Sequence, residues 1–433
     1  MTTPTNLEPL AIDGGEPVRT EPLPLGPHGI ADVGDEEIAA VTKVLRRQKI
    51  FRYLGRTDEE GPSESAQLEQ AFCEFTGCQY AIGTTGGTTA LIAGLVGIGV
   101  GVGDEVIIPA YTYIATPAAC LVVGAIPVIA EIDESMTLDP EDVAGKITEH
   151  TRAILPVHMR GMACNMDAIM ELARKHDLKV IEDCAQADGG LYKGKRLGTI
   201  GDVGCFSFDF YKLMATGEGG MLVTSDEHTY MRAQSYHDTA ACWRPDRYAR
   251  ERMAGELFCG ENYRMSELQG AVGLAQIRKL YGIVRGLISA KKRVRSGLQP
   301  SDALRPSRDN DPDDGAGGLI MIAKDTATAR TAMEALKAEG VNAGGIFNDQ
   351  VRDWHIYSNW EHILEQKSAT EEGCPFTCPY YKGRLPDYST TMCPRTSDLL
   401  TRSFGVPLGP TWTDEECGQV ADAINKVARA LDA

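Results

Sequence analysis

A glycine- and threonine-rich turn in the first quarter of the chain has the composition of an anion-binding site. Residues 83–89 read Gly-Thr-Thr-Gly-Gly-Thr-Thr and lead into an apolar helical pattern over residues 90–96. The free N–H groups and the positive dipole at such a helix start favour a phosphate, and threonine hydroxyls add donors. The turn is not a Walker P-loop, because no Gly-Lys-Ser/Thr follows it. The alternating glycines of residues 97–103 do not match a dinucleotide fingerprint either, and we interpret them as a helix end and a loop.

Two later segments supply an acid and an amine. Asp183 follows a buried strand pattern over residues 179–182, and open α/β sheets bind ligands at the carboxyl ends of their strands. Lys212 ends the aromatic run of residues 205–212 and precedes the glycine-rich residues 216–220. A helix-capping aspartate and a surface lysine are the simpler interpretations. A lysine that is desolvated by aromatic neighbours can instead act as a nucleophile in Schiff-base formation.

Taken together, the three segments match the needs of pyridoxal 5'-phosphate. The lysine would form an imine with the cofactor, the aspartate would keep the pyridine ring protonated, and the turn would hold the phosphate.

The elements that must position these residues alternate between strand and helix. Apolar patterns predict strands over residues 80–83, 105–108, 128–132, 152–157, 179–182, 203–208 and 220–224, and helices over residues 35–48, 65–76, 89–96, 116–123, 167–176 and 265–298. Such alternation predicts an α/β fold with a mostly parallel sheet covered by helices on both faces. The uncharged stretch 106–130 is long enough to span a bilayer, but prolines at 109, 117 and 127 interrupt it, so we interpret it as buried.

The length and charge of the chain narrow the function classes. The chain has 433 residues and a net charge of −18, which argues against binding to nucleic acid or to an anionic membrane. We expect an extended N-terminal arm over residues 1–30, a large cofactor-binding domain over 31–285 and a smaller α+β domain over 286–433. Residues 351–394 form an irregular insertion rich in Trp, Tyr, Pro and Cys within the smaller domain.

The cysteines and the N-terminal residues bear on location. The 12 cysteines have no zinc-site spacing, and we expect free thiols in a reducing compartment and no metal. The first 26 residues lack the basic and apolar regions of a signal peptide. Both observations favour a cytoplasmic protein.

With these segments, the chain resembles the DegT/StrS family of pyridoxal phosphate-dependent sugar aminotransferases, which have the fold-type I (aspartate aminotransferase-like) architecture. The resemblance covers nearly the whole chain. It is carried by residues 86–91, 109–119, 155–169, 181–190, 201–220, 261–277 and 404–410, and the block from Asp183 to Gly220 is the most specific.

The resemblance implies a role for each matching residue. Lys212 is the expected Schiff-base lysine and proton carrier, and Asp183 the expected partner of the pyridine nitrogen. Gln186 would reach the ring hydroxyl, and Tyr113 would stack on the ring. The resemblance implies that Gly87, Thr88 and Ser207 bind the phosphate, with Asn262 reaching it from a neighbouring subunit. A homodimer with shared active sites would follow.

The resemblance also implies transfer of an amino group from glutamate or glutamine to a keto-sugar, cyclitol or sugar-nucleoside ketone in secondary-metabolite biosynthesis. One alternative keeps the cofactor and changes the reaction to dehydration, decarboxylation or oxygen-dependent oxidation of an amino substrate. Another is a non-enzymatic cofactor-binding or regulatory protein. The complete set of cofactor residues, Lys212 included, argues against that last alternative and against the dehydrating branch of the family.

Several residues depart from the family pattern or stand near it. Asp209 places an acid three residues before Lys212, and Arg160 stands where tyrosine is common. We expect Arg160 to contact an anionic substrate group, or to pair with an acid. Further candidate substrate residues are Arg52, as a contact for a carboxylate or phosphate, together with Tyr53 and His158. His237 and the cluster of His355, Trp354 and Trp360 are candidate pocket residues, for which core packing is the simpler explanation.

Overall fold

The computed structural model describes residues 8–26, 28–53, 62–240, 251, 253–311, 317–348 and 350–433. Its largest element is a seven-stranded sheet with the strand order β1-β9-β8-β5-β4-β2-β3. The strands are β1 (Tyr80–Thr84), β2 (Glu105–Pro109), β3 (Ile126–Ala130), β4 (Thr151–Ile154), β5 (Lys179–Asp183), β8 (Val203–Ser207) and β9 (Gly220–Thr224). β9 runs antiparallel to both of its neighbours and the other pairs are parallel. The predicted mostly parallel sheet is confirmed.

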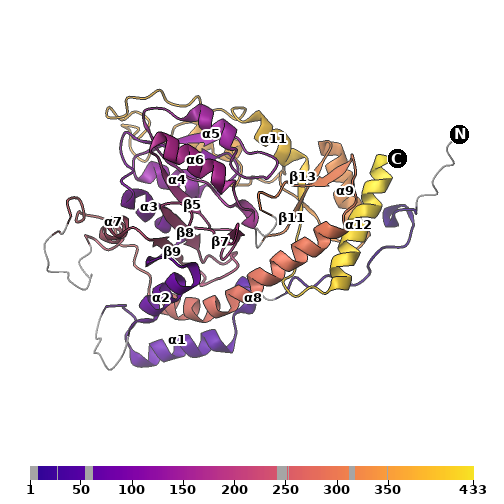
Figure 1. Ribbon diagram of the computed structural model, residues 1–433, viewed down its shortest axis with the longest axis horizontal. Helices are drawn as coiled ribbons and strands as arrows, with labels where there is room; N and C mark the ends of the chain where they lie inside the picture. The colour runs from indigo at the N-terminus through magenta and orange to yellow at the C-terminus, as the bar shows by residue number, and fades with distance from the viewer. Residues whose placement is uncertain are drawn as a thin grey trace.

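Helices cover both faces of this sheet, as Figure 1 shows. Alternate residues of the central strands enter two different apolar clusters: Val180 and Phe206 lie in one, and Ile181 and Cys205 in the other. Because successive side chains of a strand point to opposite faces, each cluster occupies one face. The helices of this part are α2 (Glu64–Thr76), α3 (Gly87–Gly97), α4 (Ala115–Val122), α5 (Pro140–Lys146), α6 (Met166–His176) and α7 (Glu227–His237). The short hairpin β6 (Leu191–Tyr192) and β7 (Lys195–Arg196) lies outside the large sheet.

A 31-residue helix, α8 (Glu267–Gly297), connects the large sheet to a second, four-stranded sheet (Figure 1). The Ser266 hydroxyl at its start accepts a hydrogen bond from the Gln269 amide, and the Gln269 side-chain oxygen accepts one from the Ser266 amide, the reciprocal arrangement that starts helices. The helix passes through position 285, where we placed the boundary between the domains. The second sheet is antiparallel, with the order β10 (Leu304–Pro306), β11 (Leu319–Ala323), β13 (Ser403–Val406) and β12 (Gly344–Gly345). Helices α9 (Thr326–Ala338) and α12 (Asp414–Asp432) pack with it in one apolar cluster.

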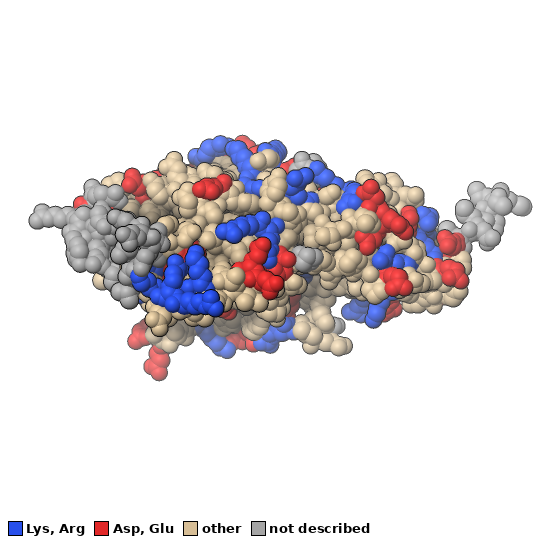
Figure 2. Space-filling model, turned by 90° about the horizontal axis from the view of Figure 1, so that it is seen from below, with Lys and Arg blue, Asp and Glu red and all other residues tan. Residues whose placement is uncertain are grey.

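The N-terminal residues are pinned to this C-terminal part by Glu339. Its two carboxylate oxygens accept hydrogen bonds from the Ala11 and Val18 amides at 2.8 and 3.0 Å, and the Lys426 ammonium lies 3.0 Å away. The arm contains two 3-10 turns, η1 (Ala11–Asp13) and η2 (Gly29–Asp32), and leads into helix α1 (Asp35–Arg47). Viewed from the side of α1, α2 and α8, the surface shows interspersed basic and acidic side chains (Figure 2).

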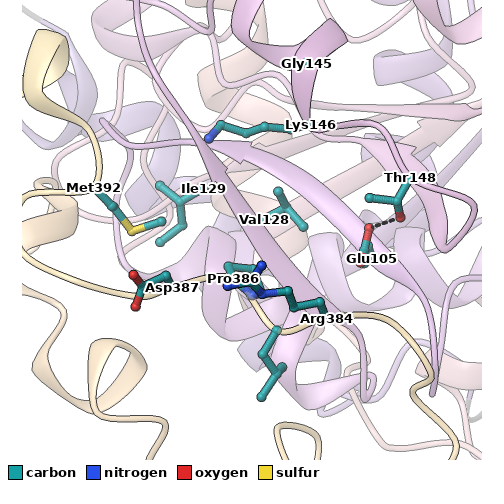
Figure 3. Close-up of a pocket in the computed structure, with 11 residues that line it drawn as sticks. Glu105, Val128, Ile129, Gly145, Lys146, Thr148, Arg384, Pro386, Asp387 and Met392 are labelled. Carbon is teal, nitrogen blue, oxygen red and sulfur yellow. Dashed lines mark hydrogen bonds between the residues drawn. The ribbon is translucent and has the colours of Figure 1, made fainter.

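The irregular insertion contains the 3-10 turn η5 (Tyr357–Asn359) and the short helix α10 (Glu361–Leu364), and α11 (Pro394–Thr401) follows it. It packs on the large sheet: the Tyr381 hydroxyl donates to Glu105 at 2.6 Å, and the Tyr388 hydroxyl donates to the Pro127 carbonyl at 2.7 Å. A cavity of about 390 Å³ lies at this contact, between β3, the end of α5 and residues 384–392 (Figure 3). Neither Asp183 nor Lys212 lines it. Among the described helices, none combines the length and apolar character needed to cross a bilayer.

Candidate active site

The glycine-rich turn, the end of β8 and the start of β9 meet at the first turn of α3. A Cβ atom on Gly87 would lie 2.7 Å from Ser207 Cβ and 3.0 Å from Ser207 Oγ, and one on Gly220 would lie 2.5 Å from the Gly86 carbonyl oxygen. The Thr89 hydroxyl closes the turn by accepting a hydrogen bond from the Gly86 amide at 3.0 Å. Thr88 is exposed beside it. The structure thus brings Gly87, Thr88 and Ser207 together around the helix start, where unpaired N–H groups favour a phosphate.

Asp183 ends β5 and is 4% exposed. Its Oδ2 accepts a hydrogen bond from the Thr116 hydroxyl at 2.9 Å, and its Oδ1 accepts one from the Ala185 amide at 3.0 Å. Burial raises the pKa of Asp183 above its usual range, although these hydrogen bonds and the charge of Lys212 oppose the rise. A buried carboxylate of this kind is stabilised by a nearby cation. The protonated nitrogen of a pyridine ring would meet that need.

Lys212 lies in the loop between β8 and β9, and its side chain is partly buried. Its backbone N–H donates to the Asp209 carbonyl at 3.0 Å, and the Asp209 carboxylate accepts from the Tyr211 amide at 3.0 Å. The N-terminal arm packs against this loop, because the Gly29 amide donates to the Leu213 carbonyl at 2.9 Å. Gly29 has a φ of 56°. A Cβ at Gly29 would lie 2.2 Å from the Lys212 carbonyl oxygen, so only glycine fits there.

Gln186 follows Asp183 in the same loop. Its side-chain oxygen accepts a hydrogen bond from the Arg160 amide at 3.1 Å, and Arg160 has a φ of 52°. Its amide nitrogen makes no hydrogen bond within the described residues. Gln186 therefore has its donor group free for an oxygen of a bound ring.

A buried pair lies behind the site. The Glu182 carboxylate accepts backbone hydrogen bonds from Gly198, Ile200 and Gly201 at 2.7–2.9 Å, and His158 Nε2 lies 3.0 Å from it. The other ring nitrogen of His158 accepts from the Cys164 amide at 3.1 Å. His158, Glu182 and Cys184 form a cluster of possible metal ligands, whose ligand atoms lie within 4.8 Å of one another. Because the carboxylate and both ring nitrogens are already hydrogen-bonded, we interpret the cluster as a structural hub.

These positions fit the cofactor that the sequence predicts: a cup of small residues at a helix start, a buried carboxylate that needs a cation, and a partly buried lysine whose charge acts on that carboxylate. The sequence profile of the DegT/DnrJ/EryC1/StrS aminotransferase family matches residues 31–375. The chain belongs to this family. It is a pyridoxal phosphate-dependent aminotransferase of fold type I.

Individual relatives of the aminotransferase agree with this assignment. GDP-perosamine synthase of Caulobacter vibrioides is 34% identical over 322 residues, which cover 71% of this chain and 81% of the relative. A putative L-glutamine:3-amino-2,3-dideoxy-scyllo-inosose aminotransferase of Micromonospora echinospora is 36% identical over 298 residues, covering 69% and 68%.

Solved structures share the fold. 3-Amino-5-hydroxybenzoic acid synthase superposes with a TM-score of 0.73 at 24% identity, covering 95% of this chain and 100% of its own. DesV from S. venezuelae, solved in complex with a ketimine intermediate, superposes with a TM-score of 0.68 at 30% identity, covering 91% and 94%.

Three of the predicted substrate residues of the aminotransferase are buried. Arg52 is 8% exposed, and its two terminal nitrogens contact the Glu69 carboxylate at 2.8 and 2.6 Å. His158 belongs to the buried hub, and His237 is 1% exposed, with a pKa lowered to about 3 by burial and by the charges of Arg52 and Arg264. Arg52 Nε and His237 Nε2 have no hydrogen-bond partner among the described residues, and the substrate roles of these three residues stay predictions.

Tyr53, Asn262 and Arg160 lie closer to the surface. Burial raises the pKa of Tyr53 to about 12, and its ring lies 4.8 Å from the Arg52 guanidinium. The Asn262 side chain is exposed and accepts a hydrogen bond from the Arg264 amide at 3.4 Å. Arg160 donates through Nε to the Tyr111 hydroxyl at 2.6 Å.

Two features of the site were missed by the sequence analysis. Asp188 is 1% exposed, and neither of its carboxylate oxygens has a hydrogen-bond partner among the described residues. Burial raises its pKa well above the usual range, opposed by the charge of Lys212. The second feature is the contact between the insertion and Tyr113. The Tyr113 ring lies 5.1 Å from that of His355, a residue that the sequence offered as a pocket candidate without indicating its partner. A signal for Asp188 was present in the sequence, since an acid among small apolar residues is unusual.

Proposed function

We propose that the aminotransferase moves an amino group from glutamate or glutamine to the ketone of a sugar, cyclitol or sugar-nucleoside in secondary-metabolite biosynthesis. The observation that carries the proposal is the convergence of Lys212, Asp183 and the Gly87–Ser207 cup in a chain of this family. The acceptor class is supported by the names of two relatives, a GDP-perosamine synthase and a putative 3-amino-2,3-dideoxy-scyllo-inosose aminotransferase.

Each residue has a task that follows from its position. Pyridoxal phosphate, when bound, supplies an electron sink for the carbon that bears the amino group. Asp183 would keep the ring nitrogen protonated, and Gln186 would donate to the ring oxygen. Lys212 Nζ would bind the cofactor in the resting enzyme, then carry the proton away from the substrate carbon and return it. Gly87, Thr88 and Ser207 would fix the phosphate, and Tyr113 would cover the ring.

The assembly belongs to the same proposal. Asn262 is exposed and makes no hydrogen bond to the cup residues of its own chain. An exposed residue suits the task of reaching a phosphate bound by a neighbouring subunit. We therefore propose a homodimer with shared sites, and a cytoplasmic location consistent with free thiols at the 11 described cysteines.

The function is tested by following the visible absorbance of the cofactor-loaded protein during addition of L-glutamate or L-glutamine. Loss of the band, with formation of the matching keto acid, supports amino transfer. No change with either donor, together with oxygen uptake or release of carbon dioxide from another amine, contradicts it. Lys212→Ala should abolish the visible band, whereas Lys195→Ala, an exposed lysine on β7, should keep it. A band that survives in Lys212→Ala would show that another residue binds the cofactor.

A further inference from the structure

The insertion places a short extended segment directly beside the loop that carries Tyr113. The Thr112 amide donates to the His355 carbonyl at 2.9 Å, and the Ile114 amide donates to the Trp354 carbonyl at 3.0 Å. The Tyr357 amide donates to the Ala110 carbonyl at 3.0 Å. These three bonds hold residues 353–357 against residues 110–114, so the insertion packs against the loop that carries Tyr113, the residue proposed to cover the cofactor ring.

Two ionisable side chains of this segment are held together. His355 Nδ1 lies 2.7 Å from Asp353 Oδ1, and the His355 amide donates to the same oxygen at 2.9 Å. Each side chain is 30% exposed, so both reach solvent. Burial raises the pKa of Asp353, but the hydrogen bonds from His355 and the charges of His355 and Arg160 outweigh it and lower that pKa. Asp353 is therefore an anion held by His355, in a segment that pairs with Tyr111, and Tyr111 is the hydrogen-bond partner of Arg160.

Within the described residues, the Arg160 guanidinium is hydrogen-bonded at one nitrogen only. Its Nε donates to the hydroxyl of the fully buried Tyr111. In the described part of the chain its two terminal nitrogens make no hydrogen bond, and no carboxylate lies within 4.0 Å of the guanidinium. The charge of Asp353, which lies beyond this distance, contributes to raising the pKa of Arg160. The guanidinium thus keeps the paired N–H groups that match a carboxylate.

We propose that Arg160 and the insertion residues Asp353 and His355 form a carboxylate subsite for the amino donor. The two terminal nitrogens of Arg160 would bind the α-carboxylate of glutamate or glutamine. Asp353, held by His355, would balance Arg160 when the uncharged ring of the ketone acceptor takes the same place. The inference rests on the proposed function, since an aminotransferase must accept both kinds of substrate at one cofactor. A partly buried Arg160 with no anion beside it would disfavour binding of the uncharged ketone acceptor.

The probe for this subsite is glutarate, a dicarboxylate without an amino group, which the enzyme cannot convert. Its affinity for the cofactor-loaded protein is measured by calorimetry. Arg160→Gln should weaken binding about tenfold or more, because a charge-assisted hydrogen-bond pair is lost. Asp353→Asn should strengthen binding by a few-fold, because a negative charge is removed while an oxygen remains for His355. Misfolding cannot imitate a gain in affinity. The control is Arg152→Gln, which removes the same charge from an exposed arginine of β4.

The double variant Arg160→Gln/Asp353→Asn should show no gain over Arg160→Gln alone, since Asp353 acts through Arg160. Absent glutarate binding, equal affinities in all variants, or weaker binding in Asp353→Asn would overturn the inference. These results are independent of the proposed function, which fails only if L-glutamate and L-glutamine both leave the visible band of the wild-type protein unchanged.

Discussion

The hydroxyl of Thr116 donates a 2.9 Å hydrogen bond to Oδ2 of Asp183, and it lies 2.7 Å from the hydroxyl of Thr112. All three groups are buried. These two hydrogen bonds form a relay that starts in α4 and its preceding loop and ends at the carboxyl end of β5. It fixes the plane of the carboxylate, so Asp183 is aimed before any cofactor arrives.

Thr116→Val should therefore weaken cofactor binding. Valine has nearly the same shape, so the change removes one hydrogen bond to a buried carboxylate with little change in packing. A loss of about 1–2 kcal/mol is expected, equivalent to roughly tenfold in affinity. Titration of the apo protein with pyridoxal phosphate measures it. Thr331→Val, on the exposed face of α9, is the control. Unchanged affinity in Thr116→Val would show that Asp183 does not need the relay.

Gly87→Ala should damage the phosphate cup. The added methyl group would lie 2.7 Å from Ser207 Cβ, so the start of α3 and the end of β8 must separate. Overpacking of this kind costs about 1–3 kcal/mol, and both the free energy of unfolding and the cofactor affinity should fall. Gly145→Ala in α5 meets nothing within 4 Å and serves as the matched control. Equal losses in the two variants would contradict the assignment of the cup.

Asp188→Asn should stabilise the apo protein at neutral pH. An acid whose pKa is raised in the folded state destabilises that state when it ionises, so the cost of Asp188 is absent below its unfolded pKa and grows as the pH rises. The gain from asparagine should be about 1–3 kcal/mol at pH 7.5 and near zero below pH 4. Urea unfolding at several pH values measures it, with the exposed Asp422→Asn as control. A gain that is independent of pH would contradict this account.

His237 should make the protein sensitive to mild acid. Its folded pKa is about 3, so between its unfolded value near 6.5 and this value only the unfolded chain binds the proton. Stability should fall by about 1.4 kcal/mol per pH unit over that window from this residue alone. His237→Gln should remove this part of the slope, and the exposed His176→Gln should not. Parallel slopes in wild type and His237→Gln would show that the imidazole titrates normally.

Much of the large sheet could be predicted because its strands are buried on both faces. Runs such as residues 105–108 and 203–208 are apolar throughout and are separated by helical patterns, so the type and order of the elements were readable. Helix α7 was missed because its sequence, Glu-His-Thr-Tyr-Met-Arg-Ala-Gln-Ser-Tyr-His, has little apolar periodicity. Its packing against α3, which includes a close approach of Gly97 to Thr229, depends on contacts distant in sequence.

The sequence pattern indicates the places of Gly87, Asp183, Ser207 and Lys212 at a helix start, at strand ends and in a loop, while their roles toward the cofactor stay predictions. The hydrogen-bond partners of individual side chains could not be predicted from the sequence. Arg52 and Arg160 look equally suited to an anion in the sequence. Only the fold shows that Glu69 pairs with Arg52, and that the two terminal nitrogens of Arg160 make no hydrogen bond to any residue that the structure describes. For the same reason, the pairing of His355 with the Tyr113 loop could not be foreseen, because it joins segments far apart in the chain.

The order of strands in the large sheet has a consequence for the kinetics of folding. β1 pairs with β9, the last of the seven strands to be synthesised, and the cup needs both. Contacts between such distant segments form slowly, because a long loop of chain must be closed first. The nascent chain therefore cannot capture its cofactor until nearly the whole sheet is assembled. Cofactor absorbance should thus appear as a late phase in refolding, after most of the helical signal has returned.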